Sequence, residues 1–248
     1  MDFSQPYIVI AFFVLLLIVA FMYASVGHGG ASGYLALMAL FSFSMEVMKP
    51  SALLLNIFVA GISFWFFKKN NHFKWKLFYP FAITSIPAAF IGGSLTINPE
   101  IYKQILGVFL IIAILRMLNL FGKNTIQTNA PKIWWPLVIG LIIGLFSGMI
   151  GIGGGIILSP VIILLGWGTI KEAAAVSALF IVVNSIAGIF GFTMSGGYIP
   201  TEAFYLVPVA IAGGAIGAFF GSGKFNTTVL TYLLSIVLLI ASIKLYLV

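Results

Sequence analysis

The sequence contains no cysteine, only two histidines and only five acidic residues. The absence of cysteine excludes disulfides, thiol catalysis and cysteine-ligated metals, and so few histidines and carboxylates predict neither a metal site nor a cofactor. Charged residues make up 7% of the 248 residues, whereas a soluble domain has about 25%. With 62% hydrophobic residues and a mean hydropathy of +1.19, the chain is predicted to be an all-α integral membrane protein in contact with the lipid bilayer.

Ten apolar segments follow one another along the chain, and most are long enough to cross a bilayer as a helix, which takes about 20 residues. The first lacks a basic leader, so it is interpreted as a membrane helix and not as a signal peptide. The second and seventh are short and each follows a glycine cluster, so they are expected to be arms of broken or re-entrant hairpins. This predicts about 8–10 transmembrane helices. The segments cover residues 7–26, 33–44, 51–67, 76–96, 101–121, 132–150, 154–167, 174–193, 203–222 and 228–247.

Two sets of five segments in the same order suggest an internal repeat. Residues 1–121 form the first predicted repeat, 122–131 a polar cytoplasmic connector, and 132–248 the second repeat. Local matches support this division: the first glycine cluster aligns with the second, Ser-Ala-Leu occurs at the same place in the third segment of each half, and an asparagine follows it. The asparagines are Asn56 and Asn184.

An odd number of crossings in each half means that the second half inserts upside down. The charges agree with this topology, because most of the lysine and arginine residues then lie on the side opposite the N-terminus. The positive-inside rule makes that side cytoplasmic and places both termini on the periplasmic or extracellular side. The net charge of +7 is explained by this loop placement, so no nucleic-acid partner is expected.

Five glycines occur within Gly148–Gly155, at a depth where a membrane helix should be continuous. Unpaired backbone in hydrocarbon costs several kcal/mol per group, so such a break survives only when buried in protein or next to water. Its freed N–H groups can bind an anion. Close helix packing is the alternative, and it is the preferred reading for Gly92-Gly93 and for Gly213–Gly217. A dinucleotide fingerprint ending at Glu172 is excluded because no βαβ unit surrounds it.

The groups expected near the membrane centre are neutral hydrogen-bond donors, and no Asp or Glu falls in the middle of any segment. Hydroxyl, amide and opened N–H groups suit an oxyanion, while sodium or proton symporters usually place carboxylates there. His28, inside the first glycine cluster, is either a structural imidazole or a proton-coupling group. The candidate substrate-binding residues are Ser25, Gly27, His28, Gly29, Gly30, Ser32, Asn56, Gly151, Gly153, Gly154, Gly155, Ser177 and Asn184.

The two glycine motifs, at residues 25–36 and 151–160, resemble those of the TauE/SafE-type sulfite exporter family, and the resemblance covers essentially the whole chain. It implies a permease for small sulfur-containing anions in a bacterial inner membrane, with the substrate site formed by the glycines of both motifs and the donors beside them. The first motif differs from the commoner glycine-plus-proline form by carrying His28 and no proline in the following segment.

The function predicted from the sequence is secondary transport of a small oxyanion of the sulfite or sulfonate class by alternating access. Inverted repeats with interrupted helices at equivalent places are typical of secondary transporters, whose site lies near the midplane. A passive anion channel on the same scaffold is the main alternative. A membrane-embedded enzyme is weaker because no nucleophile with a base can be assembled, and a purely structural partner leaves the glycine breaks unexplained. The anion, direction, coupling ion and oligomeric state stay open.

Overall fold

The structure is a computed structural model that describes residues 6–41, 43–95, 132–226, 228–230, 232–233, 235–236, 239 and 243. The segment predicted at 101–121, the predicted connector 122–131 and most of the last predicted segment lie outside the described residues. Every regular element in the described ranges is a helix, as predicted.

The described helices follow the predicted order. Five of them are long and apolar enough to cross a membrane, so the chain is a multi-pass membrane protein. The helices of the described residues, long and short together, are α1 (Pro6–Ser25), α2 (Ala31–Leu40), α3 (Met45–Lys69), α4 (Trp75–Ser94), α6 (Trp134–Ile150), α7 (Gly155–Leu164), α8 (Ile170–Met194), α9 (Thr201–Phe219) and the π-helix η1 (Phe220–Lys224).

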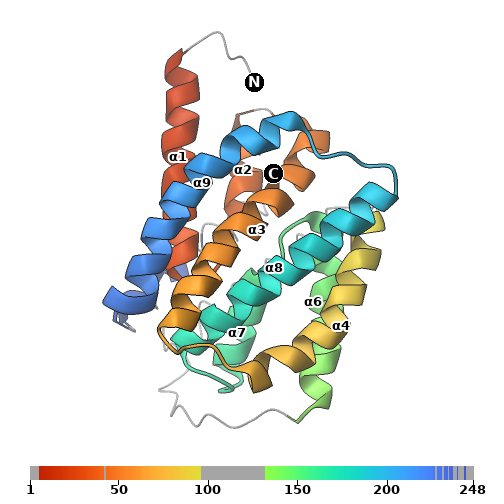
Figure 1. Ribbon diagram of the computed structural model, residues 1–248, viewed down its shortest axis with the longest axis vertical. Coiled ribbons are helices and arrows are strands. Elements are labelled where there is room, and N and C mark those ends of the chain that lie inside the picture. The colour runs from red at the N-terminus through yellow and green to blue at the C-terminus, as the bar shows by residue number, and fades with distance from the viewer. Residues whose placement is uncertain are drawn as a thin grey trace.

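The helices form two flanks on either side of a central pair (Figure 1). α3 and α8 cross at the centre, where they contact each other. α1 lies beside α9 on one flank, and α4 lies beside α6 on the other. The short helices α2 and α7 pack against α3 and α8, respectively. The first described helix of each predicted repeat therefore pairs with the fourth described helix of the other predicted repeat.

The central helices begin earlier than the sequence pattern predicts. α8 starts at Ile170 because Thr169 and Glu172 form a capping box: the Glu172 N–H donates to Thr169 Oγ1 at 3.3 Å, and the Thr169 N–H donates to Glu172 Oε2 at 2.9 Å. Such a cap satisfies two N–H groups that a helix start leaves unpaired. α3 starts at Met45 and continues through Pro50, which removes one helical hydrogen bond without ending the helix.

The flanking helix pairs pack backbone against backbone through glycines spaced four residues apart. A Cβ at any of three glycines of α6 would collide with the α4 backbone, and glycines of α9 and η1 face the α1 backbone in the same way. This confirms the packing role predicted for Gly213 and Gly217. The facing pairs are Gly140 with Phe81, Gly144 with Ser85, Gly148 with Ala89, Gly213 with Leu17, Gly217 with Phe21, and Gly221 with Ser25.

A single added methyl group should distinguish the cost of crowding at these close helix contacts from the helix propensity of the new residue. In Gly144→Ala the new Cβ would meet the Ser85 carbonyl, so we expect unfolding to become easier by about 1–3 kcal/mol, the usual cost of overpacking. In the matched Gly61→Ala variant the nearest atom to the Cβ is Val182 Cγ2 at 4.0 Å, and alanine should stabilise α3 by up to about 1 kcal/mol. Denaturation of both variants in detergent measures the difference; equal stability would refute the tight α4–α6 contact.

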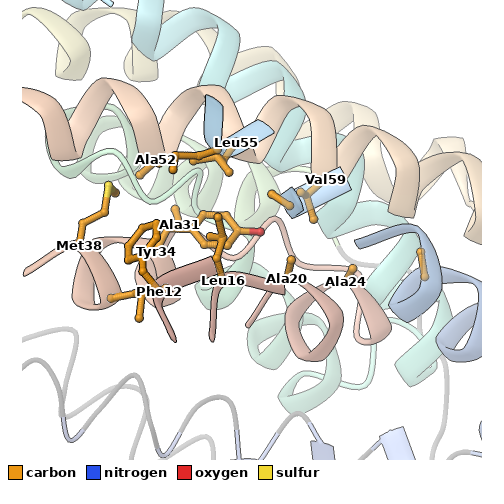
Figure 2. Packing of buried hydrophobic residues seen from close by; sticks show 14 residues of the cluster. Phe12, Leu16, Ala20, Ala24, Ala31, Tyr34, Met38, Ala52, Leu55 and Val59 are labelled. Atoms are coloured by element: carbon orange, nitrogen blue, oxygen red, sulfur yellow. The ribbon is translucent and has the colours of Figure 1, made fainter. Parts of the chain in front are cut away.

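The first short helix, α2, is held between α1 and α3 by an apolar cluster (Figure 2). α1 contributes residues at every fourth position, from Phe12 to Ala24, and α2 contributes Ala31, Tyr34 and Met38. α3 closes the cluster from the other side. The cluster fixes the start of α2, and therefore the break that precedes it, against the middle of α3.

Candidate functional site

The first break lies between α1 and α2, at residues 26–30. α1 ends in a Schellman motif: the Gly27 N–H donates to the Ala24 carbonyl at 3.1 Å, and the His28 N–H donates to the Tyr23 carbonyl at 2.9 Å. Gly27 at φ +77° and Gly30 at φ +96° occupy the left-handed region, which glycine adopts without penalty. The chain thus turns back within five residues and starts α2 at Ala31.

The second break lies between α6 and α7, at residues 151–154, and is built in a similar way. The Gly151 N–H donates to the Ser147 carbonyl at 2.9 Å and ends α6 with a left-handed residue at φ +85°. Gly153 and Gly154 also have positive φ, at +77° and +76°. Both predicted interruptions are confirmed, because no helix runs through residues 27–30 or 151–154.

Asn56, near the middle of α3, connects the two breaks. Its Oδ1 accepts the backbone N–H of Ala31 at 3.1 Å, and its Nδ2 donates to the Ile152 carbonyl at 3.1 Å. A second Nδ2 contact reaches Ser185 Oγ on α8 at 3.4 Å. The side chain is fully buried, so the one amide satisfies an N–H at the start of α2 and a C=O in the second break that would otherwise be unpaired.

A small hollow with a cavity volume of about 10 Å³ lies where the breaks meet. This is about the space that one water molecule needs, far below the roughly 300–1,000 Å³ of pockets that hold drug-sized ligands. None of its lining residues has a formal charge when His28 is neutral, and the first turn of α2 borders it with the positive end of the helix. The lining residues are Tyr23, His28, Gly29, Gly30, Ala31, Ser32, Ile152, Ile156 and Ile181.

The two halves contribute different chemistry to the hollow. The polar groups come from the first half: the Tyr23 hydroxyl lies 2.8 Å from Ser32 Oγ, and the His28 ring centroid lies 6.4 Å from that of Tyr23. The second half contributes the three isoleucine side chains. A ligand in the hollow would therefore meet hydrogen-bonding groups on one side and aliphatic carbon on the other.

His28 is buried and is bonded to the second half through serines. Its Nε2 lies 3.0 Å from Ser159 Oγ on α7, and Ser159 Oγ donates to Ser177 Oγ on α8 at 2.8 Å. Its Nδ1 is buried without a hydrogen-bond partner among the described residues. An unsatisfied buried polar atom costs about 1–3 kcal/mol, and a hydrogen bond to a ligand or the binding of a proton at Nδ1 would offset this cost.

Most of the predicted site residues meet in this region. His28, Gly29, Gly30 and Ser32 line the hollow. Gly153 lies at the Asn56 junction, where a Cβ would approach Asn56 Nδ2 to 2.7 Å. Ser177 takes part through its bond to Ser159, which is not among the predicted site residues.

The remaining predicted serine and glycines lie in the breaks or directly beside them but do not line the hollow. The Ser25 hydroxyl donates to the Met22 carbonyl of its own helix at 2.7 Å. Gly27 packs on the Ala174 backbone, Gly151 on the Lys49 side chain, Gly154 on Ile143 and Phe180, and Gly155 on Ile181.

Asn184 does not play the part of Asn56 in the second half. Its Nδ2 donates to the Phe180 carbonyl, one turn back in α8, at 2.8 Å, and its Oδ1 is buried without a partner among the described residues. It does not line the hollow.

Sequence reasoning missed the tyrosine and the isoleucines of the hollow. Ile152, inside the second glycine motif at the place where the first motif has His28, carried a signal that could have been read. Tyr23, Ile156 and Ile181 are indistinguishable by residue type from many other apolar positions of the membrane helices.

A second polar cluster lies where the C-terminal end of α3 and the loop after it contact η1. His72 Nε2 lies 3.1 Å from the Ser222 carbonyl, Asn70 Nδ2 donates to Ser222 Oγ at 3.0 Å, and Lys171 Nζ donates to the same carbonyl at 3.4 Å. The α3–α4 loop is thereby bonded to η1 and to the start of α8. This part of the chain fixes the arrangement of three helices and does not border the hollow.

The His72 contact predicts a pH-dependent stability. Burial, together with the charge of Lys171, lowers the pKa of His72 below its usual 6.5, and the Ser222 carbonyl and Glu172 offset this only in part. The neutral imidazole is thus favoured by folding, so its contribution is complete above about pH 6.5 and is lost as the pH falls below that value. We expect the melting temperature to fall from about pH 7.5 to about pH 5.5, and to fall less in His72→Asn, when unfolding is followed in detergent. A larger fall in the variant would contradict the direction of the shift.

Comparison with known proteins gives a consistent result. The model of the family described as sulfite exporter TauE/SafE matches residues 12–245. A probable membrane transporter protein, y4hK of Sinorhizobium fredii, is 38% identical over 99% of each chain. A probable membrane transporter protein of Bacillus subtilis, YunE, is 28% identical over 81% of this chain and 80% of its own. No solved structure matches the chain.

The family match covers the breaks, the hollow and the Asn56 junction together. The strongly apolar helices and the names of the relatives agree on the kind of protein. This chain therefore belongs to the sulfite exporter TauE/SafE family and is a membrane transporter, not an enzyme.

Proposed function

We propose that the protein is a secondary transporter that moves a small anion of the sulfite or sulfonate class across the bacterial inner membrane by alternating access. The observation that carries this proposal is the hollow at the junction of two broken helix pairs, where the Asn56 side chain bonds to both breaks. Interrupted helices that meet near the membrane centre are where secondary transporters bind their substrates.

The chemistry of the hollow favours an anion. The start of α2 contributes the positive end of its helix dipole, and the hydroxyls of Tyr23 and Ser32 can donate hydrogen bonds. Among the described residues, no carboxylate lines the hollow to repel an anion or to bind a cation. The description of the family as sulfite exporters supports a sulfur oxyanion, and the isoleucines give the hollow an apolar side that a short aliphatic group could contact.

The transport cycle we propose needs two inverted halves, residues 1–121 and 132–248. Their described helices have similar lengths in the same order: 20, 10, 25 and 20 residues for α1 to α4, and 17, 10, 25 and 19 residues for α6 to α9. The helix pairing also agrees with two equivalent halves. The pair α1 and α9 becomes the pair α6 and α4 when each helix is replaced by its equivalent in the other half, and both pairs are in contact. Rocking of one flank against the other around Asn56 would then expose the hollow alternately to the cytoplasm and to the periplasm, the side where we place both termini.

Exchange kinetics in proteoliposomes test the proposal. Vesicles loaded with unlabelled sulfite or taurine and placed in a trace of the labelled anion should accumulate label transiently, because a carrier exchanges one bound anion for another. Flux should also saturate with concentration. A flux that rises linearly and shows no such accumulation would favour a passive channel, and no flux with sulfite, thiosulfate, taurine, sulfoacetate or simple carboxylates would refute an anion transporter. A thermal-shift screen of the purified protein against the same compounds selects the anion to use.

A further inference from the structure

The two ring nitrogens of His28 have different surroundings. Nε2 lies 3.0 Å from Ser159 Oγ, whereas Nδ1 is buried and has no hydrogen-bond partner in the described part of the chain. The ring itself borders the hollow. The imidazole is thus fixed to α7 through one nitrogen, and the other is the polar atom left for a ligand or a proton.

The serine chain determines which nitrogen carries the hydrogen. Ser159 Oγ donates its hydrogen to Ser177 Oγ at 2.8 Å, and a hydroxyl has only one hydrogen to give. Ser159 can therefore only accept from His28, so Nε2 must be the protonated nitrogen. A neutral imidazole carries one N–H, and Nδ1 is consequently an unprotonated acceptor.

We propose that Ser159 and Ser177 are positioning residues that hold His28 in the Nε2–H form, so that Nδ1 accepts one proton for each anion carried. The proposal rests on the transport function proposed above. The proton leaves a hydronium ion or the conjugate acid of the anion and forms the Nδ1–H bond, which gives an imidazolium next to the anion. A monoanion and its proton would then cross together without net charge.

The surroundings of His28 explain why proton and anion should bind together. From α1 the titratable group that faces it is Tyr23, whose ring centroid lies 6.4 Å away. α7 and α8 present the two serines and the aliphatic Ile156 and Ile181. The part of the chain that the structure describes places no carboxylate in the lining of this space, so an imidazolium alone would be a buried unpaired charge, which is strongly unfavourable. An anion in the hollow supplies the missing partner, and each ligand therefore raises the affinity for the other.

Nuclear magnetic resonance can read this form of His28 directly. The chain has two histidines. A His72→Gln background therefore leaves His28 as the single imidazole, and it changes a residue that does not line the hollow. With nitrogen-labelled histidine at neutral pH and no anion, we expect a directly bonded hydrogen on Nε2 and none on Nδ1. Ser159→Ala should give a mixture of the two forms, and Ser159→Thr, which keeps the hydroxyl, should restore the single form. An Nδ1–H form in the unaltered site, or an unchanged form in Ser159→Ala, would overturn the proposal.

Proton movement in proteoliposomes gives the second measurement. Uptake of a monoanion with no titrating group near neutral pH, such as 2-bromoethanesulfonate, should acidify the vesicle interior by about one proton for each anion, and Ser159→Ala should lose this coupling more than it loses anion exchange. Anion flux without any acidification would overturn the inference while the transport function stands. If no anion moves at all, the proposed function fails, and the resonance experiment still decides whether the serines set the form of His28.

Discussion

Replacing Asn56 with leucine is expected to abolish transport and to reduce the free energy of unfolding by about 2–6 kcal/mol, since two buried backbone groups lose their partner at about 1–3 kcal/mol each. The groups are the N–H of Ala31 and the C=O of Ile152, bonded to Asn56 at 3.1 Å each. Leucine is close to asparagine in size but offers no hydrogen bond. Denaturation in detergent and anion exchange in proteoliposomes measure the two effects.

Two variants serve as controls for Asn56→Leu. Asn184→Leu removes an amide whose Nδ2 bonds only to its own helix, at Phe180, so we expect transport to continue with a smaller loss of stability. Asn56→Asp keeps an acceptor for the Ala31 N–H but loses the donor to Ile152, and should fall between the wild type and the leucine variant. Equal losses at Asn56 and Asn184 would contradict the special position of Asn56.

Gly153→Leu and Gly154→Leu are the second pair of changes for which we expect a complete loss of transport with membrane insertion intact. Both residues have positive φ, +77° and +76°, where an L-residue costs about 1–2 kcal/mol. A Cβ would also approach Asn56 Nδ2 to 2.7 Å at Gly153 and Ile143 Cγ2 to 2.7 Å at Gly154. The second break would have to move away from α3, and the hollow would lose its shape.

Membrane insertion and flux are measured separately for these glycine variants. Protein in the membrane fraction that remains a single species in detergent, but does not exchange anions, is the expected result. Gly61→Leu provides a control on α3, because its Cβ would lie 4.0 Å from the nearest side chain. Normal exchange in Gly153→Leu would show that the second break does not shape the substrate site.

The sequence was a good guide to the breaks and a poorer one to the starts of the helices. Five glycines in eight residues cannot belong to a stable membrane helix, and the chain is interrupted within that stretch, at 151–154, and at 26–30. The start of α8 at Ile170 was missed because a single capping box decides it, and Thr169 and Glu172 carry no hydrophobic signal. The start of α3 at Met45, six residues before the predicted segment, was also missed, and the helix continues through Pro50.

The partner of Asn56 in the second half could not be found from sequence matches. Asn184 follows the same Ser-Ala-Leu pattern, but both breaks approach Ile181 instead: a Cβ at Gly29 or Gly153 would lie near both Asn56 and Ile181. Ile181 and Asn184 are three residues apart, so they project from roughly the same side of α8 but lie nearly one turn apart along its axis. The hollow is polar on one side and aliphatic on the other partly because the second glycine motif has Ile152 at the place where the first has His28.

The position of the bound anion is the most direct test of the account. A crystal structure of the protein with selenite or 2-bromoethanesulfonate would locate the heavy atom by its anomalous scattering. We expect one peak in the hollow, between His28 and Ser32 on one side and the three isoleucines on the other. A peak elsewhere, with the hollow filled by side chains, would contradict the assignment of the two helix breaks as the anion site.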